Sequence, residues 1–405
     1  MTTENPAGSP ANVDRLVTRP FFLILLFAFM FFVGVGMTLP LLPVFVRDEL
    51  QGSDLAIGIV VAIQAVAAIL VRPWINPRLA RYGTVKVIMW GAFLGALSMG
   101  LMSFSPNVIT LVFLRLVLGG AQAAMFIAML STIMSWVSEW RRAEAASVFS
   151  VAPYIGLAIG PVIGQLTYKS LGFTTAFVLS GVIAFVGALP ILSLRNVKID
   201  LGTASAEDPN AVPPPKFYLP ALLPGTVLAL GIVGMVGMNA FLPLYAPELG
   251  TSQVQWMFFF YAAVVLSIRL FGRRIPDRVG PRKTGIWSTS FIVIGLVIMA
   301  VTPSWPGIYL ALIPLATGIA LQYPGLMALV LSDVDDRVRP SAISTFTMFF
   351  DIAQGLGGLV VGIAAALGGY RAVFGFGALC SVIGLVMLVV LVLPRYAKTV
   401  IPVTK

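Results

Sequence analysis

Asp351 is the only acidic residue placed well inside a long apolar stretch of the sequence. It shares a polar stripe with Ser344, Thr347 and Gln354, because spacings of three and four residues put side chains on one face of a helix. Burial favours the neutral form of a carboxyl group and a nearby cation favours the charged form, so a carboxyl balanced between the two can exchange a proton. Asp351 is therefore a candidate proton carrier, and the alternatives are a helix-packing polar group or a permanent ion-pair partner.

Arg115 is a second ionisable residue inside an apolar stretch, and Gly119 and Gln122 follow it on the same helix face. It lies about 12 Å from the outer end of its helix at 1.5 Å per residue. An arginine at that depth costs about 3 kcal/mol on insertion scales and above 10 in simulations, so it should face protein or a water-filled cavity. We interpret Arg115 and Gln122 as ligand-binding candidates, the alternative being a structural arginine tied to backbone carbonyls.

Weaker candidates for lining a cavity are polar residues in other apolar stretches, each of which is also common at helix interfaces: Tyr154, Asn239, Tyr261, Gln322 and Tyr323. The sequence has no histidine and a single cysteine, Cys380, inside an apolar run. Zinc sites built on imidazole and Ser-His or Cys-His nucleophile pairs are thereby excluded. We therefore expect no catalytic residues, no metal site and no cofactor.

The composition requires a lipid environment. Of the 405 residues 59% are hydrophobic and 10% are charged, and the mean hydropathy is +0.97, whereas soluble proteins carry roughly 25% charged residues. Apolar stretches of about 20 residues, the length that crosses a bilayer core, predict twelve transmembrane helices near 20–46, 54–75, 86–104, 107–136, 143–168, 173–195, 218–247, 251–272, 283–302, 305–332, 340–367 and 371–394. The prediction is an all-α polytopic membrane protein.

The net charge of +10 reports topology rather than a nucleic-acid partner. Nearly all Lys and Arg flank alternate loops on one side, and the opposite side has little beyond Arg47, Lys169 and Arg371. The positive-inside rule makes the basic side cytoplasmic. We expect a plasma-membrane protein whose two termini both face the cytoplasm.

The chain divides into two related halves. We predict a cytoplasmic tail over 1–19, a six-helix bundle over 20–195, a cytoplasmic linker over 196–217, a second six-helix bundle over 218–394 and a tail over 395–405. At an offset of 197, Arg72 maps onto Arg269, Gly83 onto Gly280 and Tyr154 onto Asp351, among other pairs. Parallel repeats of this kind are typical of transporters that rock two bundles around a central site.

Two loops carry a basic motif. The loop Arg273–Lys283 contains Asp277, Arg278, Gly280 and Arg282, and the equivalent first-half loop keeps Arg81 and Gly83 but has Ala80 where the acid belongs. The pattern resembles the cytoplasmic loop motif of the major facilitator superfamily. The resemblance implies that Asp277 helps to latch the two halves together on the cytoplasmic side, the alternative being an ordinary basic inner loop.

The stretch Gly156-x-x-x-Gly160-Pro161-x-x-Gly164 resembles the antiporter motif of the drug:proton branch of that superfamily. Glycines four apart let membrane helices approach closely, and Pro161 removes a helix hydrogen bond. Close packing alone is the alternative explanation. Leu111, Arg115, Gly119 and Gly120 also fit the intramembrane arginine motif of the family.

The resemblance covers nearly the whole chain and implies two pseudo-symmetric six-helix bundles that work by alternating access. We expect a functional monomer that exports a small amphipathic drug-like compound or metabolite in exchange for protons. The alternative within transport is an importer or facilitator of a sugar, organic acid or other nutrient. A membrane enzyme or receptor is a remote alternative, because the only acidic cluster, Asp333, Asp335 and Asp336, lies in a charged loop.

The charge distribution generates a topology prediction. In a chain whose only thiol, Cys380, is first replaced, single cysteines in the tails and in the 196–217 linker should resist a membrane-impermeant thiol reagent added to intact cells. They should react after the membrane is opened. Labelling of the linker from outside would overturn the assignment.

Overall fold

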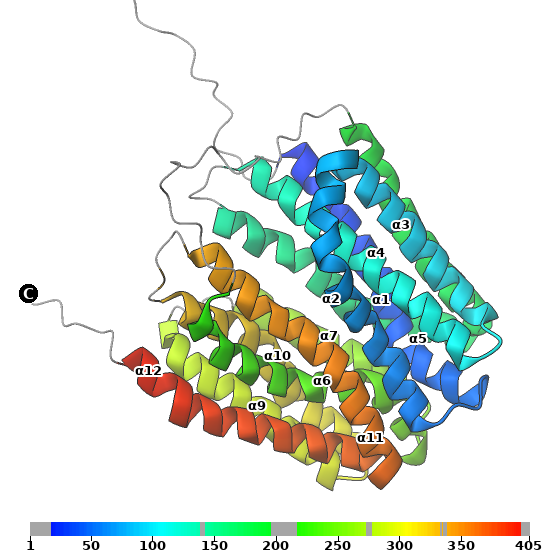
Figure 1. Cartoon of the computed structure of the whole chain (residues 1–405). Coiled ribbons are helices and arrows are strands. Elements are labelled where there is room, and N and C mark those ends of the chain that lie inside the picture. Colours follow the sequence, from blue (N-terminus) through cyan, green and yellow to red (C-terminus); the bar gives the residue numbers. More distant parts are fainter. Residues whose placement is uncertain are drawn as a thin grey trace, which may run out of the picture.

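The computed structural model describes residues 18–137, 142–195, 217–272, 278–332, 334 and 338–397, and within these ranges the chain forms helices and no strands. The linker 196–217 and the two predicted tails lie almost wholly outside the described residues. The first half contains α1 (Arg19–Asp48), α2 (Asp54–Tyr82), α3 (Thr84–Leu101), α4 (Val108–Ser135) and α5 (Arg142–Ala188). The second half contains α6 (Leu222–Glu248), α7 (Val254–Phe271), α9 (Pro281–Val301), α10 (Trp305–Leu331), α11 (Arg339–Met387) and α12 (Leu393–Ala397) (Figure 1).

Ten helices of the described chain are long and apolar enough to cross a membrane, and two of them are each long enough to cross twice. The apolar stretches Val151–Leu194 and Ser341–Tyr396 have 44 and 56 residues, so the shorter one measures about 66 Å at 1.5 Å per residue. Each stretch is broken at a glycine with positive φ, Gly172 at 81° and Gly369 at 71°. The described residues thus form twelve spans, as predicted.

The two breaks lie at equivalent positions of the repeat. Gly172 and Gly369 are separated by 197 residues, as are Gly83 and Gly280, which have φ of 79° and 87° and lie between consecutive helices. Side chains with a Cβ rarely adopt this left-handed backbone. The sequence repeat is therefore also a repeat of backbone turns.

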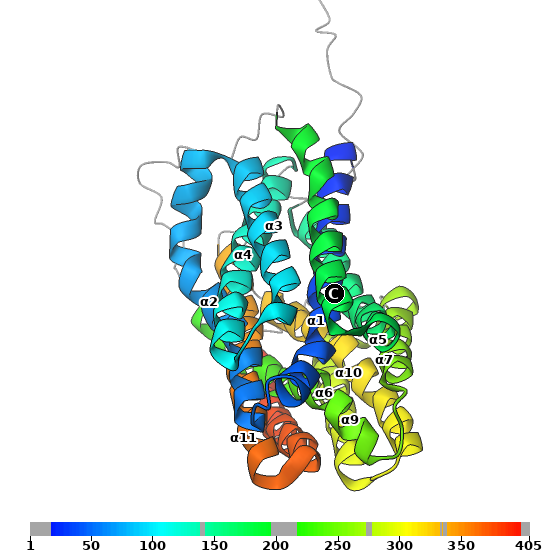
Figure 2. The same ribbon diagram turned by 90° about the vertical axis from the view of Figure 1, so that its right-hand side faces the viewer.

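The helix packing follows the same symmetry. Within the first half α1 packs against α5 and α3 against α4, and within the second half α6 packs against α11 and α9 against α10. The two halves meet where α2 lies against α11, α7 against α5, and α1 against α6. Figure 2 shows the first half, coloured blue to green, beside the second half, coloured green to red, with α11 against α2.

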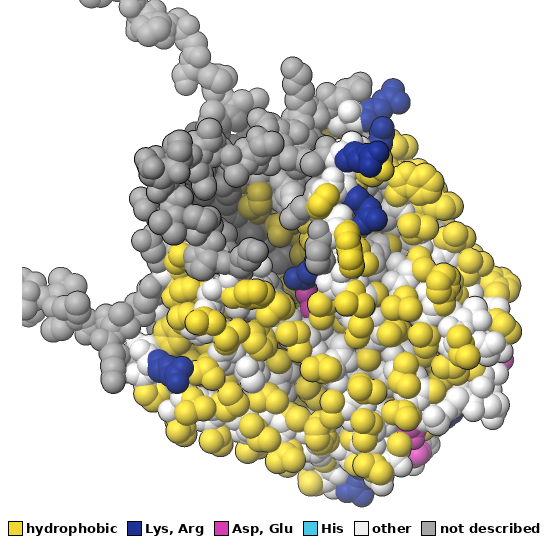
Figure 3. All heavy atoms as spheres, in the orientation of Figure 1, with side chains coloured by type: hydrophobic (Ala, Val, Ile, Leu, Met, Phe, Trp, Pro, Cys, Tyr) yellow, Lys and Arg dark blue, Asp and Glu magenta, His cyan; other side chains and the backbone are white. Residues whose placement is uncertain are grey.

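The outside of the bundle is hydrophobic. Large apolar side chains point outward on many helices, among them Trp90, Ile109 and Leu310 at 65%, 80% and 60% exposure. Figure 3 shows hydrophobic side chains over the middle of one face, while most of the Lys and Arg lie toward its edges. Such a surface is stable only against lipid.

We call the end of the bundle that carries Arg19, Gly83, Gly280 and Ala397 the terminal face, and the opposite end, which carries Asp48–Asp54 and Gly369, the distal face. The halves are closely packed toward the distal face. A Cβ on Gly58 of α2 would lie 2.8 Å from the carbonyl oxygen of Gly358 and 2.9 Å from the Cα of Gly362 on α11. Near the same face Arg47 Nη1 donates to the hydroxyl of Tyr370 at 3.4 Å.

The Gly58 contact generates a prediction about conformation. Gly58→Ala should push α2 and α11 apart, since overpacking a tight contact costs about 1–3 kcal/mol. In a chain with Cys380 replaced, a cysteine at the buried Ala62 should then react with a thiol reagent roughly fivefold faster or more, given about 1.4 kcal/mol per tenfold. Gly100→Ala is the matched control, because the nearest atom to its added Cβ is 4.0 Å away. Equal labelling in the two variants would contradict the prediction.

Candidate functional site

An ion pair joins the two halves inside the apolar interior. Nη2 of Arg72, from α2, donates to Oδ2 of Asp351, from α11. The side chains retain 37% and 27% exposure, so the pair is partly screened rather than sealed. Asp351 lies about 18 Å along α11 from Arg339 at 1.5 Å per residue, well within the span. The candidate proton carrier therefore has a cationic partner from the opposite half.

The symmetry-related position carries a different pair. Arg269 of α7 and Tyr154 of α5 occupy the repeat positions of Arg72 and Asp351, and the guanidinium carbon of Arg269 lies 3.9 Å from the centre of the Tyr154 ring. A guanidinium over an aromatic face is attracted by the negative face of the ring. One flank of the interface is thus bridged by an ion pair and the other by a cation–π contact.

Tyr323 of α10 lies near both pairs. Its ring centre is 6.2 Å from that of Tyr154 and 5.5 Å from that of Phe346, and it is close enough to Asp351 to interact electrostatically with the carboxylate. The structure therefore brings together Asp351, Tyr154 and Tyr323, three of the residues that the sequence nominated separately.

Arg115 of α4 is 1% exposed and is held by the backbone of α2. Its Nε donates to the carbonyl oxygen of Val60 at 3.1 Å and its Nη2 to that of Val61 at 3.4 Å, while Nη1 is buried without a hydrogen-bond partner. These contacts are those of a structural arginine tied to backbone carbonyls, the alternative named above, except that Nη1 has no partner.

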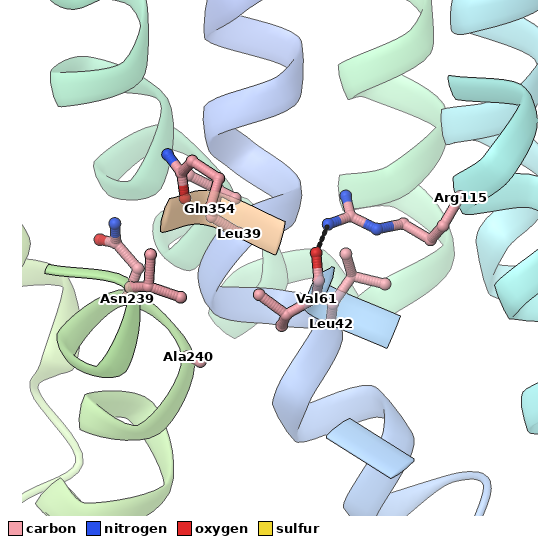
Figure 4. Close-up of a pocket in the computed structure, with 8 residues that line it drawn as sticks. Leu39, Leu42, Val61, Arg115, Asn239, Ala240 and Gln354 are labelled. Atoms are coloured by element: carbon pink, nitrogen blue, oxygen red, sulfur yellow. Dashed lines mark hydrogen bonds between the residues drawn. The ribbon is translucent and has the colours of Figure 1, made fainter. Parts of the chain in front are cut away.

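A small cavity of about 20 Å³ lies beside Arg115 and is lined by both halves, which is room for about one water molecule. Asn239 of α6 and Gln354 of α11 are among its lining residues. Figure 4 shows Arg115 reaching toward the Val61 carbonyl, with Asn239 and Gln354 on the other side. Of the sequence candidates, Arg115 and Asn239 therefore share one small, mostly apolar cavity between the halves.

Gln122 pairs with a residue that sequence reasoning did not nominate. Gln64 Nε2, on α2, donates to Gln122 Oε1 on α4 at 2.7 Å, and Gln64 Oε1 is buried without a partner. The remaining two candidates lie inside the second half. Gln322 is 1% exposed and its Nε2 is 3.5 Å from the carbonyl oxygen of Val227, whereas Tyr261 is 9% exposed within an apolar cluster.

The loop motif is described in part. Gly83 and Gly280 provide the positive-φ turns that start α3 and α9. Arg81 and Arg278 are exposed, and Arg282 donates to the carbonyl oxygen of Tyr396 near the C-terminus. Asp277 lies outside the described residues, so its latch role stays a prediction.

The glycine motif of α5 packs against α1. A Cβ on Gly156, Gly160 or Gly164 would lie 2.7, 2.5 and 2.5 Å from the backbone oxygens of Phe29, Val33 and Met37, respectively. The glycines and the oxygens both recur every four residues, so α5 and α1 are in backbone contact over two turns. Pro161 is buried in the same contact. The motif therefore holds two helices of the first half together.

Sequence reasoning nominated Asp351 but not its partner Arg72, nor Arg269. The sequence does contain a signal for these two arginines. Both lie inside apolar stretches and are related by the 197-residue offset, as are Tyr154 and Asp351. Among the described residues, no three of His, Cys, Asp and Glu lie close enough together to hold a metal ion.

Comparison with known proteins gives consistent matches. The model of the Major Facilitator Superfamily matches residues 24–337 and 241–405. An uncharacterized MFS-type transporter of Salmonella typhimurium is 25% identical over 390 residues, which cover 93% of this chain and 97% of the relative. The multi-drug resistance efflux pump PmrA of Streptococcus pneumoniae is 27% identical over 366 residues, 86% of this chain and 89% of the pump.

Among solved structures, the nucleoside transporter NupG has a TM-score of 0.71 and 15% or less sequence identity, with 92% of this chain and 98% or more of that chain covered. At this identity the likeness concerns the fold alone. The twelve spans in two related halves agree with the family match over nearly the whole chain. The protein therefore belongs to the Major Facilitator Superfamily and is a multi-pass membrane transporter, not an enzyme.

Proposed function

We propose that this chain is a proton-coupled exporter of small amphipathic compounds, in which Asp351 carries the proton. The observation that supports the proposal is the Asp351–Arg72 ion pair, because each half supplies one partner. Protonation of Asp351 removes the negative charge and with it the ionic link between α2 and α11. The charge state of one carboxyl group is thereby coupled to the separation of the halves.

The size of the coupling suits a transport cycle. A ligand or proton shifts a conformational equilibrium only by the difference in its affinity for the two states, and coupling free energies are typically 1–3 kcal/mol. Breaking a fully buried pair by removing one partner costs about 3–5 kcal/mol, and partial exposure of Arg72 and Asp351 reduces this. The pair is strong enough to bias the halves and weak enough to be broken in each cycle.

We propose that the terminal face is cytoplasmic, following the distribution of Lys and Arg. The glycine contact between α2 and α11 and the Arg47–Tyr370 bond then close the outer side in this conformation. We also propose that the chain works as a monomer, since its own two halves supply both partners of the Asp351–Arg72 pair. We place this monomer in the plasma membrane.

Export is favoured over import by two observations. The relatives include PmrA, described as a multi-drug resistance efflux pump, and the Gly156–Gly164 pattern resembles the antiporter motif. The apolar and aromatic surroundings of the site, such as Tyr154, Tyr323 and Phe346, suit an amphipathic cargo. In the alternative, a facilitator or importer of a nutrient, the Asp351–Arg72 pair is permanent and carries no proton.

Asp351→Asn provides the central test. The neutral amide cannot titrate and cannot form the ion pair, so proton-gradient-driven transport in proteoliposomes should be lost, with a drop of tenfold or more. Energy-independent exchange of the cargo should persist, because the cavity keeps its shape. Both are measured by flux with and without an imposed pH gradient, across a panel of drugs, sugars and amino acids.

Asp351→Glu is the matched variant, since it keeps a titratable group and moves it by about one methylene. Its transport should have a shifted pH optimum. Full gradient-driven transport by Asp351→Asn would show that another group carries the proton or that the chain is a facilitator.

Arg115→Lys tests the second intramembrane charge. Lysine keeps the charge but loses the planar fork whose Nε and Nη2 donate to Val60 and Val61. We expect transport to fall about tenfold, because hydrogen bonds to a charged group contribute about 1.5–3 kcal/mol each. Wild-type flux in Arg115→Lys at an equal amount of protein in the membrane would contradict this expectation.

A further inference from the structure

The two repeat-related arginines differ in what faces them. Arg72 faces the carboxylate of Asp351, whereas Arg269 faces the uncharged ring of Tyr154 at the equivalent position. Among the described residues no acidic side chain pairs with Arg269, and its Nε, like that of Arg72, is buried without a hydrogen-bond partner. One of two equivalent positions therefore lacks the negative charge that the other has.

The interior as a whole carries excess positive charge. The described spans contain Arg72, Arg115 and Arg269, the last of them in the final turn of α7, and a single acid at a comparable depth, Asp351. Arg115 is held by two backbone carbonyls and Arg72 by the carboxylate. A charge inside a membrane protein is stabilised when it is paired. Tyr154 stabilises Arg269 through its ring and its hydroxyl, and among the described residues no acid does so. The guanidinium can therefore still accept an anionic partner.

Arg269 is also placed where a ligand can reach it. It lies in the last turn of α7, and both it and Tyr154 are only partly buried. The residues that follow it, Leu270 and Phe271, are 58% and 87% exposed. The ring of Tyr323 packs edge to face against the ring of Tyr154 and adds an aromatic surface next to the guanidinium.

We propose that Arg269 binds an anionic group of the cargo, a carboxylate, sulfonate or phosphonate, and that this group supplies beside Arg269 the negative charge that Asp351 supplies beside Arg72. The inference rests on the proposed transport function and assigns the class of its cargo: an amphipathic anion with an aromatic or aliphatic body against Tyr154 and Tyr323. A planar guanidinium fork matches a carboxylate in a bidentate pair. Because Arg269 and Tyr154 belong to different halves, an anion that contacts both side chains bridges the halves.

The test uses probes that share a body and differ in charge. Three carboxylates, 2-naphthoate, indole-3-acetate and decanoate, are compared with their neutral amides and with the corresponding primary ammonium compounds. Binding to the purified full chain is measured as the shift of its unfolding temperature, and flux is measured in proteoliposomes with and without a proton gradient. We expect at least one carboxylate to bind about tenfold or more tightly than its amide, as a charge-assisted bidentate pair allows.

Two variants address the site. Arg269→Gln removes the cation, and Tyr154→Asp supplies the acid that the repeat position lacks, so both should abolish the preference for the carboxylate over the amide. Tyr154→Asp should leave Arg269 in an internal ion pair and thus retain a folded transporter. Arg395→Gln, at an exposed arginine of α12, is the charge-matched control and should keep the wild-type preference.

The outcomes separate this inference from the proposed function. The inference fails if no carboxylate is preferred in any of the three pairs, if ammonium compounds or amides are preferred, or if both Arg269→Gln and Tyr154→Asp keep the preference. Gradient-driven transport of amides or ammonium compounds would then still support proton-coupled export. Preferred carboxylate binding without gradient-driven transport would support the anion site and refute the coupling.

Discussion

The charge of an ionisable group inside an apolar span must be balanced, and this constraint organises the centre of the molecule. An unpaired ion in this environment costs several kcal/mol, so each arginine is stabilised by a neighbouring group. Arg115 donates to carbonyl oxygens of α2, Arg72 forms an ion pair with Asp351, and Arg269 lies over the ring of Tyr154. Two of these three solutions cross between the halves. The stabilisation of these charges therefore depends on the relative position of the two halves.

The glycines determine how closely the helices approach, and they act in two different ways. Within the first half, Gly156, Gly160 and Gly164 bring α5 onto the backbone of α1 and make a rigid unit. Between the halves, Gly58, Gly358 and Gly362 make an equally close contact of α2 with α11 toward the distal face. The same residue type thus makes the close helix contacts both inside the first half and between the halves.

The repeat is conserved in geometry but not in chemistry. Backbone turns at Gly83 and Gly280, and at Gly172 and Gly369, recur at the same offset as the two arginines. The positions facing those arginines differ, with a titratable carboxylate on one flank and a phenol on the other. Under our two proposals the flanks divide the work, since the proton acts at Asp351 and the anion of the cargo acts at Arg269. Such a division arises when two copies of one fold keep their packing and diverge at the residues they present to the interface.

The sequence by itself determined the fold class, since apolar stretches of membrane-crossing length and the 197-residue offset follow from the composition and order of residues along the chain. It also singled out Asp351 and Arg115, because isolated charges in apolar segments are visible without coordinates. Only the tertiary structure decided their partners. Arg72 is 279 residues from Asp351, and helical periodicity assigns a face to each residue without saying which helix that face meets. The same holds for Arg269 and Tyr154, whose pairing depends on how two bundles, each folded on its own local pattern, come together.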